Sequence, residues 1–574
     1  MNLLAMSFEG ELAPSFDLRC LRGERLPDGW GLGYYPGGDP AATVLKEPNP
    51  AEGSIRGDLV KAWEHLESSL FMVHIRTATW GAASDANTQP FVRSYARRDW
   101  MFGHSGSLRH GIESRPRPRF EPVGGTDTEQ VFCDLLDRIA EKGWRSLAEA
   151  DPMLLRGWLD AFNEHGTLSA ALTDGRDLYI YADRDGDPIH VGQLRPPYER
   201  LALADTELSV DLTRRGTKPR KGVVASTGRL DVDTDGACAW RILPPGHLLV
   251  LRQGAVMTEV GPSRAGPGVT PVARHGRDVT RLDRAEPRRF HVVHRTTYTY
   301  ERPVERSQHI FRLEPLVDRL QTVTSSEVHC SVDGKMRIYD DVFGNRIRRL
   351  HLDRPYQELL IEARSTVDVL DVDPLDYRPL QARTLIPLVW MPWQRHMLQP
   401  FLLPPELPAS ELDELLDYAM SFVRRNDYDL LSTLCDMTQT IYREYAYRPG
   451  VTTLSTTAYE VYVTRQGVCQ DFTNLFICLA RLLSVPARYV CGYVYTGEKS
   501  ANHAMSEASH AWAQVYLPEA GWKGFDPTNG IITQTDHVRV AVGRNYRDTT
   551  PTSGTIYVGG GGETLAAEVR IERE

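Results

Sequence analysis

The sequence lacks several features that define whole classes of proteins. It has no basic excess, because 66 lysines and arginines stand against 76 aspartates and glutamates and the formal net charge is -10. That balance offers no electrostatic footprint for nucleic acid, so we expect no nucleic-acid partner. No apolar run approaches the roughly 20 residues of a membrane span, and the first residues lack the basic start and apolar core of a signal peptide. We therefore expect a cytoplasmic protein without a membrane partner.

Cysteine pairs and metal-ligand patterns are missing too. The eight cysteines are scattered with no CxxC pair, which predicts free thiols rather than a disulfide framework. His503 and His510 have no set of partner ligands, and the spacing of a calcium loop is absent. The four glycines at 559–562 lack the spacing of a phosphate loop, which favours a turn or linker. We expect no cofactor and no metal.

What is present is a chain of 574 residues, long enough for about three domains. Residues 1–262 are rich in strand patterns and contain one clear helix pattern at 128–139, which Thr126 or Thr128 could cap. Residues 263–289 lose periodicity and gain glycine, proline and arginine, as is typical of an interdomain linker. Residues 290–400 predict a small antiparallel β region with a turn at 341–345, and residues 401–574 predict helices followed by strands.

A cysteine in the last of these regions has the setting of a nucleophile. The segment Gly-Val-Cys-Gln-Asp-Phe at 467–472 places Cys469 where a loop becomes a helix. A helix start offers unpaired N–H groups and partial positive charge, which favour the reactive thiolate form of a cysteine. His510 is expected to begin a strand and Asp526 to end the next one. There the imidazole would pair with the thiolate and protonate a leaving group, while the carboxylate orients it. The backbone N–H of Cys469 is a candidate oxyanion donor.

The alternative for any lone cysteine is simple burial in the core, since free cysteine is among the most buried residue types. Cys478, inside the helix, and Cys491, inside a strand, fit that alternative. Cys469 differs in its helix-start position, in its polar neighbours Gln470 and Asp471, and in the histidine and aspartate motifs that follow it.

These motifs resemble the bacterial transglutaminase-like superfamily over residues 290–570. The matching segments are Gly-Val-Cys-Gln-Asp at 467–471, Val-Pro-Ala-Arg-Tyr-Val-Cys-Gly-Tyr at 485–493, Ser-His-Ala-Trp at 509–512 and Gly-Phe-Asp-Pro-Thr-Asn at 524–529. The resemblance implies a papain-like fold, in which a helical part carries the nucleophile and an antiparallel sheet carries histidine and aspartate. It assigns the catalytic triad to Cys469, His510 and Asp526, and it makes residues 290–400 the β-rich N-terminal region that often precedes such a domain.

Residues 1–262 resemble a second family, the class II glutamine amidotransferase domain. The segments that carry the resemblance are Asp-Gly-Trp-Gly at 28–31, His-Ile-Arg-Thr-Ala-Thr at 74–79, Gly-His-Ser-Gly at 103–106 and Thr-Asp-Thr-Glu at 126–129. The resemblance implies an αββα sandwich with an N-terminal nucleophile. It also implies an amino-acid pocket formed by Arg76, Thr79, Gly106 and Asp127.

Two departures from this second family bear on activity. The family nucleophile is a cysteine directly after the initiator methionine, and this sequence has Asn2, whose carboxamide is no nucleophile. The third motif normally reads His-Asn-Gly, and here Ser105 replaces the asparagine that donates to the oxyanion. We interpret residues 1–262 as a pseudo-glutaminase that retains an amino-acid pocket. Two alternatives are a structural ion pair between Arg76 and Asp127, and a working glutaminase if Asn2 is an engineered change from cysteine.

The sequence thus predicts an α+β multidomain enzyme that hydrolyses an amide or peptide bond through a Cys469 thioester. Transamidation onto an amine is the nearest alternative, because the same thioester serves either acceptor. A non-catalytic binding scaffold is the second alternative, which the presence of Cys469, His510 and Asp526 disfavours. The expected partners are a peptide or amide substrate and an amino-acid ligand in the N-terminal domain.

Overall fold

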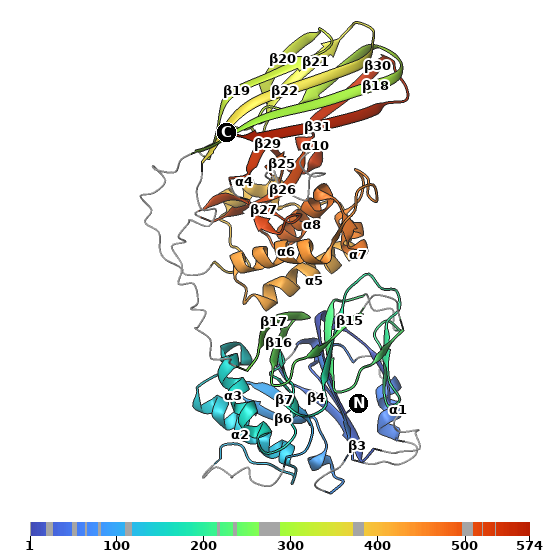
Figure 1. The fold of residues 1–574 in the computed structure, drawn as a ribbon, viewed down its shortest axis with the longest axis vertical. Coiled ribbons are helices and arrows are strands. Elements are labelled where there is room, and N and C mark those ends of the chain that lie inside the picture. The colour runs from blue at the N-terminus through green and yellow to red at the C-terminus, as the bar shows by residue number, and fades with distance from the viewer. Residues whose placement is uncertain are drawn as a thin grey trace. The chain divides into compact units, whose positions relative to one another are not determined.

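The computed structural model of the chain describes residues 2–18, 27–38, 40–48, 54–62, 66–77, 82–108, 118–214, 219–233, 238–262, 287–318, 320–370, 384–495, 509–518, 520–533 and 535–574. The chain divides into two compact units, Met1–Val269 and Thr270–Glu574. Both combine many strands with fewer helices (Figure 1). Most of the expected linker, 263–286, lies outside the described residues. No helix in the described part is long and apolar enough to cross a membrane.

Two antiparallel sheets form the centre of the first unit. The larger has the order β15 (Cys238–Leu243), β10 (Ile189–Leu194), β13 (Gly222–Ser226), β1 (Leu3–Leu12), β5 (Ser68–Arg76), β3 (Gly29–Tyr34) and β4 (Thr43–Glu47). The smaller has the order β17 (Ala255–Val260), β16 (Leu248–Arg252), β9 (Asp177–Tyr181), β8 (Ser169–Thr173), β7 (Arg98–Ser105) and β6 (Phe91–Tyr95).

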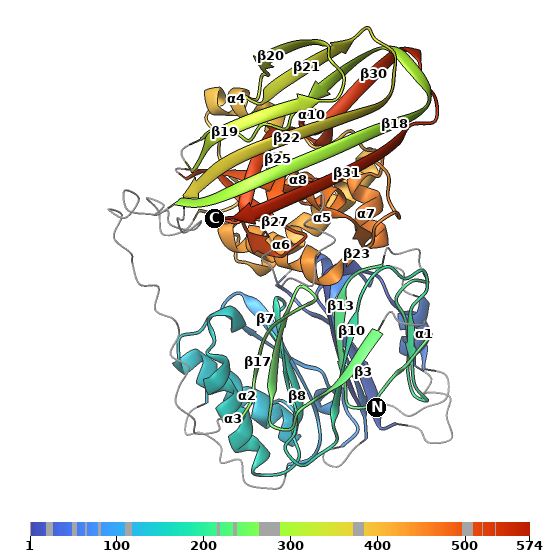
Figure 2. The same cartoon turned by 45° about the horizontal axis from the view of Figure 1, so that its top comes forward.

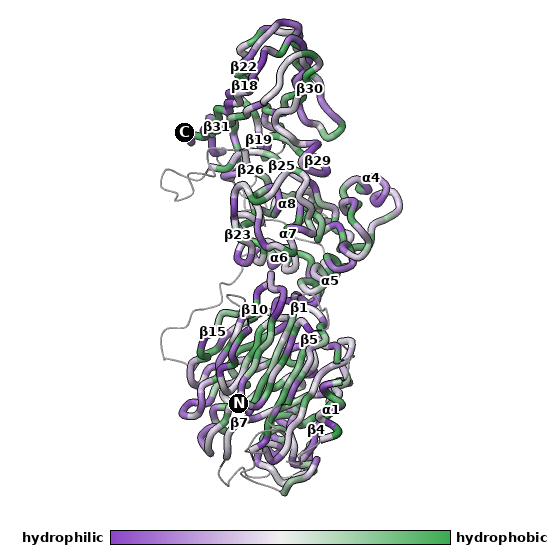
Figure 3. The backbone as a smooth tube through the Cα atoms, turned by 90° about the vertical axis from the view of Figure 1, so that its right-hand side faces the viewer, coloured by the Kyte–Doolittle hydropathy of each residue, from purple (hydrophilic) through white to green (hydrophobic). Residues whose placement is uncertain are grey.

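Strand β1 shows why the larger sheet is buried on both faces. Side chains alternate along a strand, and in β1 both sets are apolar. Leu3 and Ala5 belong to the core between the two sheets, whereas Leu4, Met6 and Phe8 belong to the core on the opposite face. Figure 3 shows the resulting apolar runs along β1, β5 and β10.

Helices cover the outer face of the smaller sheet. They are α2 (Asp127–Glu141) and α3 (Pro152–Asn163), and Phe132 of α2 stacks on Phe102 of β7 with ring centroids 5.4 Å apart. The predicted cap is confirmed, because the Thr126 side chain accepts a hydrogen bond from the Glu129 N–H. Figures 1 and 2 show the two helices together beside this sheet.

The outer face of the larger sheet differs from the αββα expectation. It is covered by one short helix, α1 (Ile55–Ala62), and by a small sheet of the order β14 (Asp231–Val232), β11 (Ala202–Ala204), β12 (Ser209–Asp211) and β2 (Ser15–Asp17). Leu203 and Val210 from these short strands join the outer core beside Phe8. Short strands therefore supply the apolar cover that a pair of helices would give in an αββα sandwich.

The second unit contains a sheet built on one very long strand, β18 (Pro287–Phe311). One side of β18 pairs with β22 (Tyr356–Leu370) and then with β21 (Arg346–Leu352), and β19 (Gln321–Cys330) and β20 (Lys335–Asp340) extend the sheet. The other side pairs with β31 (Thr564–Arg573) and β30 (Thr552–Gly559). Figure 2 shows β18 running between β22 and β31.

This pairing corrects the grouping of residues 401–574 into one domain. The last two strands of the chain complete the sheet of the β-rich region, because β18 is long enough for β30 and β31 to share one of its edges. Strand pairing between residues more than 240 positions apart leaves no local pattern in the sequence.

The remaining residues of the second unit form a helical part and a five-stranded antiparallel sheet. The helices are α4 (Pro392–Leu402), α5 (Ala409–Arg425), α6 (Leu430–Glu444), α7 (Ala458–Thr464), α8 (Cys469–Leu482) and the short α10 (Tyr546–Thr549). The sheet has the order β28 (Ile531–Ile532), β27 (Gly521–Asp526), β26 (His510–Leu517), β25 (Ala487–Val494) and β29 (His537–Gly543). Helix α8 is the central helix, and its Leu475, Phe476 and Leu479 are fully buried in the shared core.

Two side-chain amides of the β-rich region bind the open edge of β29. Asn345 donates to the Val542 carbonyl and accepts from the Val542 N–H, both at 2.8 Å. Gln321 likewise donates to the Arg539 carbonyl at 2.8 Å and accepts from its N–H at 2.9 Å. Both amides are fully buried. They satisfy the edge of this sheet as a neighbouring strand would, and so join the β-rich region to it.

We predict that Asn345→Ala destabilises the protein by about 1–3 kcal/mol, because it leaves the buried N–H and C=O of Val542 without partners. Urea unfolding of the full chain, followed through a signal from the second unit, measures this change in the free energy of unfolding. The matched control is Gln357→Ala, since Gln357 makes a single exposed hydrogen bond to the Glu301 carbonyl. The control should change stability by less than about 0.5 kcal/mol. Equal effects of the two substitutions would contradict the role given to Asn345.

Candidate functional site

Cys469 is the first residue of α8, as predicted. The turn before it is closed by Asp471, whose carboxylate accepts hydrogen bonds from the Val468 N–H at 2.8 Å and from the Thr452 hydroxyl at 2.6 Å. Gly467 lies so near that an added Cβ would come within 2.8 Å of the Asp471 side chain. The residues before the helix are therefore held in one conformation, and Cys469 has a fixed position.

A buried arginine anchors the same turn from the other side. Arg465 adopts a left-handed backbone conformation with φ of 53° and ends α7. Its guanidinium lies 4.7 to 4.9 Å from the ring centroids of Tyr462, Tyr445 and Tyr418. It donates to the hydroxyl of Tyr418 at 2.9 Å and to that of Tyr445. Cation–π contacts and hydrogen bonds thus compensate a buried charge four residues before the thiol.

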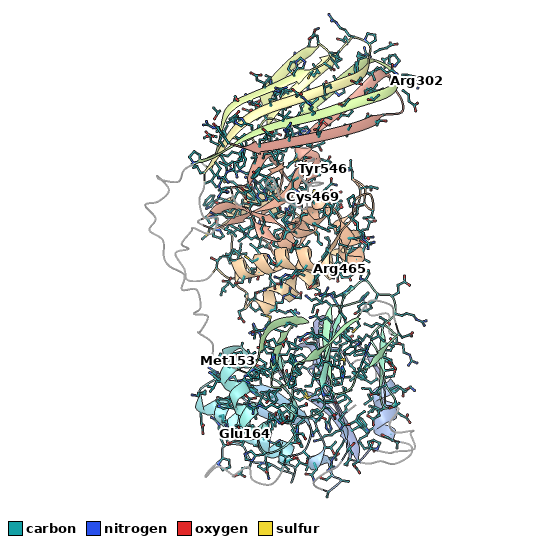
Figure 4. All side chains as sticks on the ribbon, in the orientation of Figure 1. Met153, Glu164, Arg302, Arg465, Cys469 and Tyr546 are labelled. Carbon is teal, nitrogen blue, oxygen red and sulfur yellow. The ribbon has the colours of Figure 1, made fainter. Side chains whose placement is uncertain are left out.

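His510 and Asp526 lie where the sequence predicted, at the start of β26 and the end of β27. The Nε2 of His510 donates to the Oδ2 of Asp526 at 2.9 Å, and both side chains are buried. The Cys469 side chain lies near enough to His510 to help raise the pKa of the imidazole. Figure 4 labels Cys469 within the second unit, near the start of α8. The three predicted residues are therefore brought together.

The charges in this cluster are coupled. Burial alone would lower the pKa of His510, but the Asp526 carboxylate and the Cys469 side chain outweigh burial and raise that pKa to about 10. Burial would raise the pKa of Asp526, but His510 and His537 hold it well below its usual range. At neutral pH the pair is an imidazolium and a carboxylate, so His510 carries a proton that it can donate.

Sequence reasoning missed two residues that bind the same carboxylate. His537, the first residue of β29, donates from Nε2 to the Oδ2 of Asp526 at 3.2 Å, and its ring packs edge-on against Trp512. The Asn529 side chain donates to the same oxygen at 2.7 Å. His537 stands alone in its segment, so no spacing rule could find it. Asn529 lies three positions after Asp526, and the backbone turn after β27 places it.

In the first unit the predicted pocket residues lie on separate elements. Arg76 ends β5 and Asp127 begins α2. Burial lowers the pKa of Arg76, and the carboxylate that opposes this effect is Asp28. Asp127 accepts hydrogen bonds from the N–H groups of Leu108 and Thr128, each at 2.8 Å. Among the interactions described for these two residues, none joins Arg76 to Asp127. Thr79 lies outside the described residues.

The other predicted positions of this unit are Asn2, Ser105 and Gly106, and the structure describes them through their backbone. The described hydrogen bonds of Asn2 use its backbone: its N–H donates to the Thr227 hydroxyl at 3.1 Å, and its carbonyl accepts from Ile75. Ser105 ends β7. Gly106 has φ of 140°, and a Cβ there would lie 2.2 Å from the Thr167 carbonyl oxygen, so the position requires glycine.

Comparison with known families accounts for both units. The model of class II glutamine amidotransferases matches residues 1–270. The bacterial transglutaminase-like N-terminal region matches residues 290–368, and the transglutaminase-like superfamily matches residues 418–527. The chain belongs to both families. It joins an amidotransferase-like domain to a transglutaminase-like domain, and the second places it among cysteine-dependent enzymes.

Three individual relatives each match only part of this chain. The uncharacterised protein MJ1515 of Methanocaldococcus jannaschii is 31% identical over 45% of this chain and 70% of its own length. The uncharacterised protein Rv2569c of Mycobacterium tuberculosis is 31% identical over 49% of this chain and 92% of its own length. A predicted glutamine amidotransferase from Pseudomonas aeruginosa has a solved structure that is 25% identical over 45% of this chain and all of that one, with a TM-score of 0.36.

We predict that Asp526→Asn converts His510 from a charged to a neutral imidazole at pH 8. Without the carboxylate, burial dominates and lowers the His510 pKa by several units from about 10. Because the folded-state pKa is raised above 6.5, the stability that His510 contributes is fully present below pH 6.5 and is lost as the pH rises through about 10. Nitrogen-15 NMR of labelled histidine reads the charge state directly.

Two controls accompany this titration. His294 is buried, and burial lowers its pKa to about 4, so its ring should be neutral at pH 8 in both proteins. His537→Gln keeps a donor for Asp526 and should leave His510 charged. A neutral His510 in the unsubstituted protein at pH 8 would contradict the proposed charge pairing.

Proposed function

We propose that the transglutaminase-like domain is a hydrolase of amide or peptide bonds that works through a thioester on Cys469. The carrying observation is the buried, hydrogen-bonded pair of His510 and Asp526, which lies beside the side chain of a cysteine at a helix start and whose imidazole pKa that cysteine helps to raise. An amidase that acts through a thiol needs a nucleophile, an acid for the leaving amine and a group that orients the acid. We assign these three tasks to Cys469, His510 and Asp526 in that order.

The reaction divides into two steps. In the first, the Cys469 sulfur bonds to the carbonyl carbon, the carbon–nitrogen bond breaks, and His510 gives its proton to the departing amine. In the second, water attacks the thioester carbon while His510 accepts a proton from it, and the sulfur departs as thiolate. The first N–H groups of α8 lack acceptors within the helix, and that of Cys469 would donate to the oxyanion in both steps.

Transamidation is the alternative outcome of the same thioester, with an amine in place of water in the second step. Added amines distinguish the two, since an amide product forms only if the amine reaches the thioester before water does. The scaffold alternative requires no reaction at Cys469 at all.

We predict that Cys469 reacts with iodoacetamide at least about tenfold faster than Cys478 or Cys491 at pH 7. Burial raises the pKa of each of those two thiols to about 12, so they provide internal controls in the same molecule. Mass spectrometry of tryptic peptides gives all three rates. With a peptide library as substrate, a covalent acyl adduct should appear on Cys469 and should be absent from Cys469→Ala. Equal slow labelling of the three cysteines would favour the scaffold.

We further propose that the amidotransferase-like domain is a pseudo-glutaminase that binds an amino acid. Asn2 offers no thiol, and Ser105 stands where the family has an oxyanion donor. Burial lowers the pKa of His74 to about 3 and also lowers that of His104, so neither neighbouring imidazole supplies a positive charge in place of the missing thiol. The support for binding is the buried Arg76 guanidinium, a group suited to an amino-acid carboxylate.

Calorimetry on the full chain tests this second proposal. Glutamine or glutamate should bind with an affinity that falls about tenfold or more in Arg76→Met, because the substitution removes the charged partner of the ligand carboxylate. The same titrations should release no ammonia from glutamine. No heat from either amino acid, at concentrations that detect millimolar binding, would rule out the pocket.

A further inference from the structure

A cavity of about 610 Å³ lies within the second unit, outside the catalytic cluster. One wall comes from the long-stranded sheet, with Tyr298 and Tyr300 of β18 and Ser553 of β30. The opposite wall is the loop of Leu454 and Ser455. Its volume falls in the range of about 300–1,000 Å³ that is typical of sites for small ligands.

Two connections place this cavity next to the thiol. The phenol of Tyr546 lines the cavity, and the Cys469 side chain is near enough to that phenol to add to the rise in its pKa that burial and Cys491 cause. Figure 4 labels both residues within the second unit. The second connection is the loop at 452–455, because Thr452 donates to Asp471 at the start of the cysteine helix. The loop wall of the cavity is thereby tied to the turn that holds the nucleophile.

The lining has the character of a binding site for a neutral, largely apolar group. Three tyrosine rings and the aliphatic side chains of Ile556 and Leu565 supply apolar surface. Arg547 and Glu563 are the charged lining residues, and their charges are opposite. The cavity therefore gives a charged ligand little advantage over a neutral one.

One buried polar atom in the lining is left without a partner. His309 is 1% exposed, and its Nε2 hydrogen-bonds with the hydroxyls of Tyr356 at 2.9 Å and Ser307 at 3.0 Å. Its Nδ1 has no hydrogen-bond partner among the described residues. That atom lies against Gly554, where an added Cβ would come within 2.7 Å of it, so a larger residue at 554 would press on the His309 ring. Burial lowers the pKa of His309 to about 4, so the ring is neutral and adds no charge to the lining.

We propose that this cavity binds the part of a peptide substrate that carries an aromatic or aliphatic side chain near the bond attacked by Cys469. This assignment rests on the proposed function of Cys469. The tyrosine rings receive the apolar side chain of the peptide. The β-rich region then contributes directly to substrate selection, through β18 and β30.

Electrophilic peptides test the assignment without knowledge of the natural substrate. The probes are iodoacetyl peptide amides with one, two or three glycines followed by a terminal phenylalanine, glycine or aspartate, and plain iodoacetamide is the reference. The thiolate displaces iodide from each probe and forms a thioether on Cys469, which mass spectrometry quantifies. The best phenylalanine probe should label Cys469 about tenfold faster than the glycine probe of equal length, because burial of the ring stabilises the encounter. The aspartate probe should show no such advantage.

Matched variants test whether the faster labelling by the phenylalanine probe arises from binding in the cavity. Thr552→Trp fills the cavity from β30, because the Thr552 side chain faces the tyrosine wall and its hydroxyl hydrogen-bonds with that of Tyr298 at 2.7 Å. It should bring the phenylalanine-to-glycine ratio close to one. Thr555→Trp, three residues along the same strand, on its opposite face and outside the lining, should keep the ratio. Leu454→Asp alters the opposite wall at a side chain that is 72% exposed, so it should fold and also lower the ratio.

Failures of the two proposals are distinguishable. If plain iodoacetamide labels Cys469 no faster than Cys478 and Cys491, the proposed function is wrong whatever the tail does. If Cys469 is reactive but phenylalanine gives no advantage, the cavity assignment is wrong. The assignment is equally overturned if the advantage survives both Thr552→Trp and Leu454→Asp.

Discussion

The candidate site of the second unit depends on the buried carboxylate of Asp526 and its hydrogen bonds. The side chain is fully buried, and an isolated carboxylate in such a place would be strongly unfavourable. Two imidazoles and one side-chain amide bind Oδ2, while the backbone N–H groups of Thr528 and Asn529 bind Oδ1. These partners come from β26, from β29 and from the turn after β27. The carboxylate is therefore charged and fixed only when all three parts of the sheet are in register.

That requirement extends to the β-rich region. Strand β29 is at the edge of its sheet and carries His537, one of the two imidazoles. Asn345 and Gln321 hold this edge through paired hydrogen bonds, and Arg539 of β29 binds Asp318 at 2.9 Å. The apolar contact beside them joins Phe290 and Val569 of the long-stranded sheet to Tyr493 and Val538. The β-rich region thus helps to support the Asp526 carboxylate, and the two regions form one compact unit.

The sequence predicts those features whose cause is local. A cysteine before an amphipathic helix, a histidine at a strand start and an aspartate at a strand end each have a short-range signal, and the structure has all three elements where expected. The sequence also predicts the turn at 341–345. Its cause is local, because Asp341 accepts hydrogen bonds from the N–H groups of Phe343 and Asn345. The second role of Asn345, across 197 residues to Val542, had no local signal. His537 and the pairing of β30 and β31 with β18 were missed for the same reason.

At position 2 of the amidotransferase-like domain, the reaction of the family depends on the side chain, whereas the fold depends on the backbone. Asn2 contributes its described hydrogen bonds through the backbone, to Thr227 and Ile75, so the strand does not depend on the identity of that side chain. Gly106 is different, because a Cβ would collide with the Thr167 carbonyl. A change at position 2 therefore removes a nucleophile at little structural cost, whereas a change at Gly106 would distort the loop beside it. A domain built this way can lose its reaction and retain its shape, which leaves Cys469 as the nucleophile of the proposed chemistry.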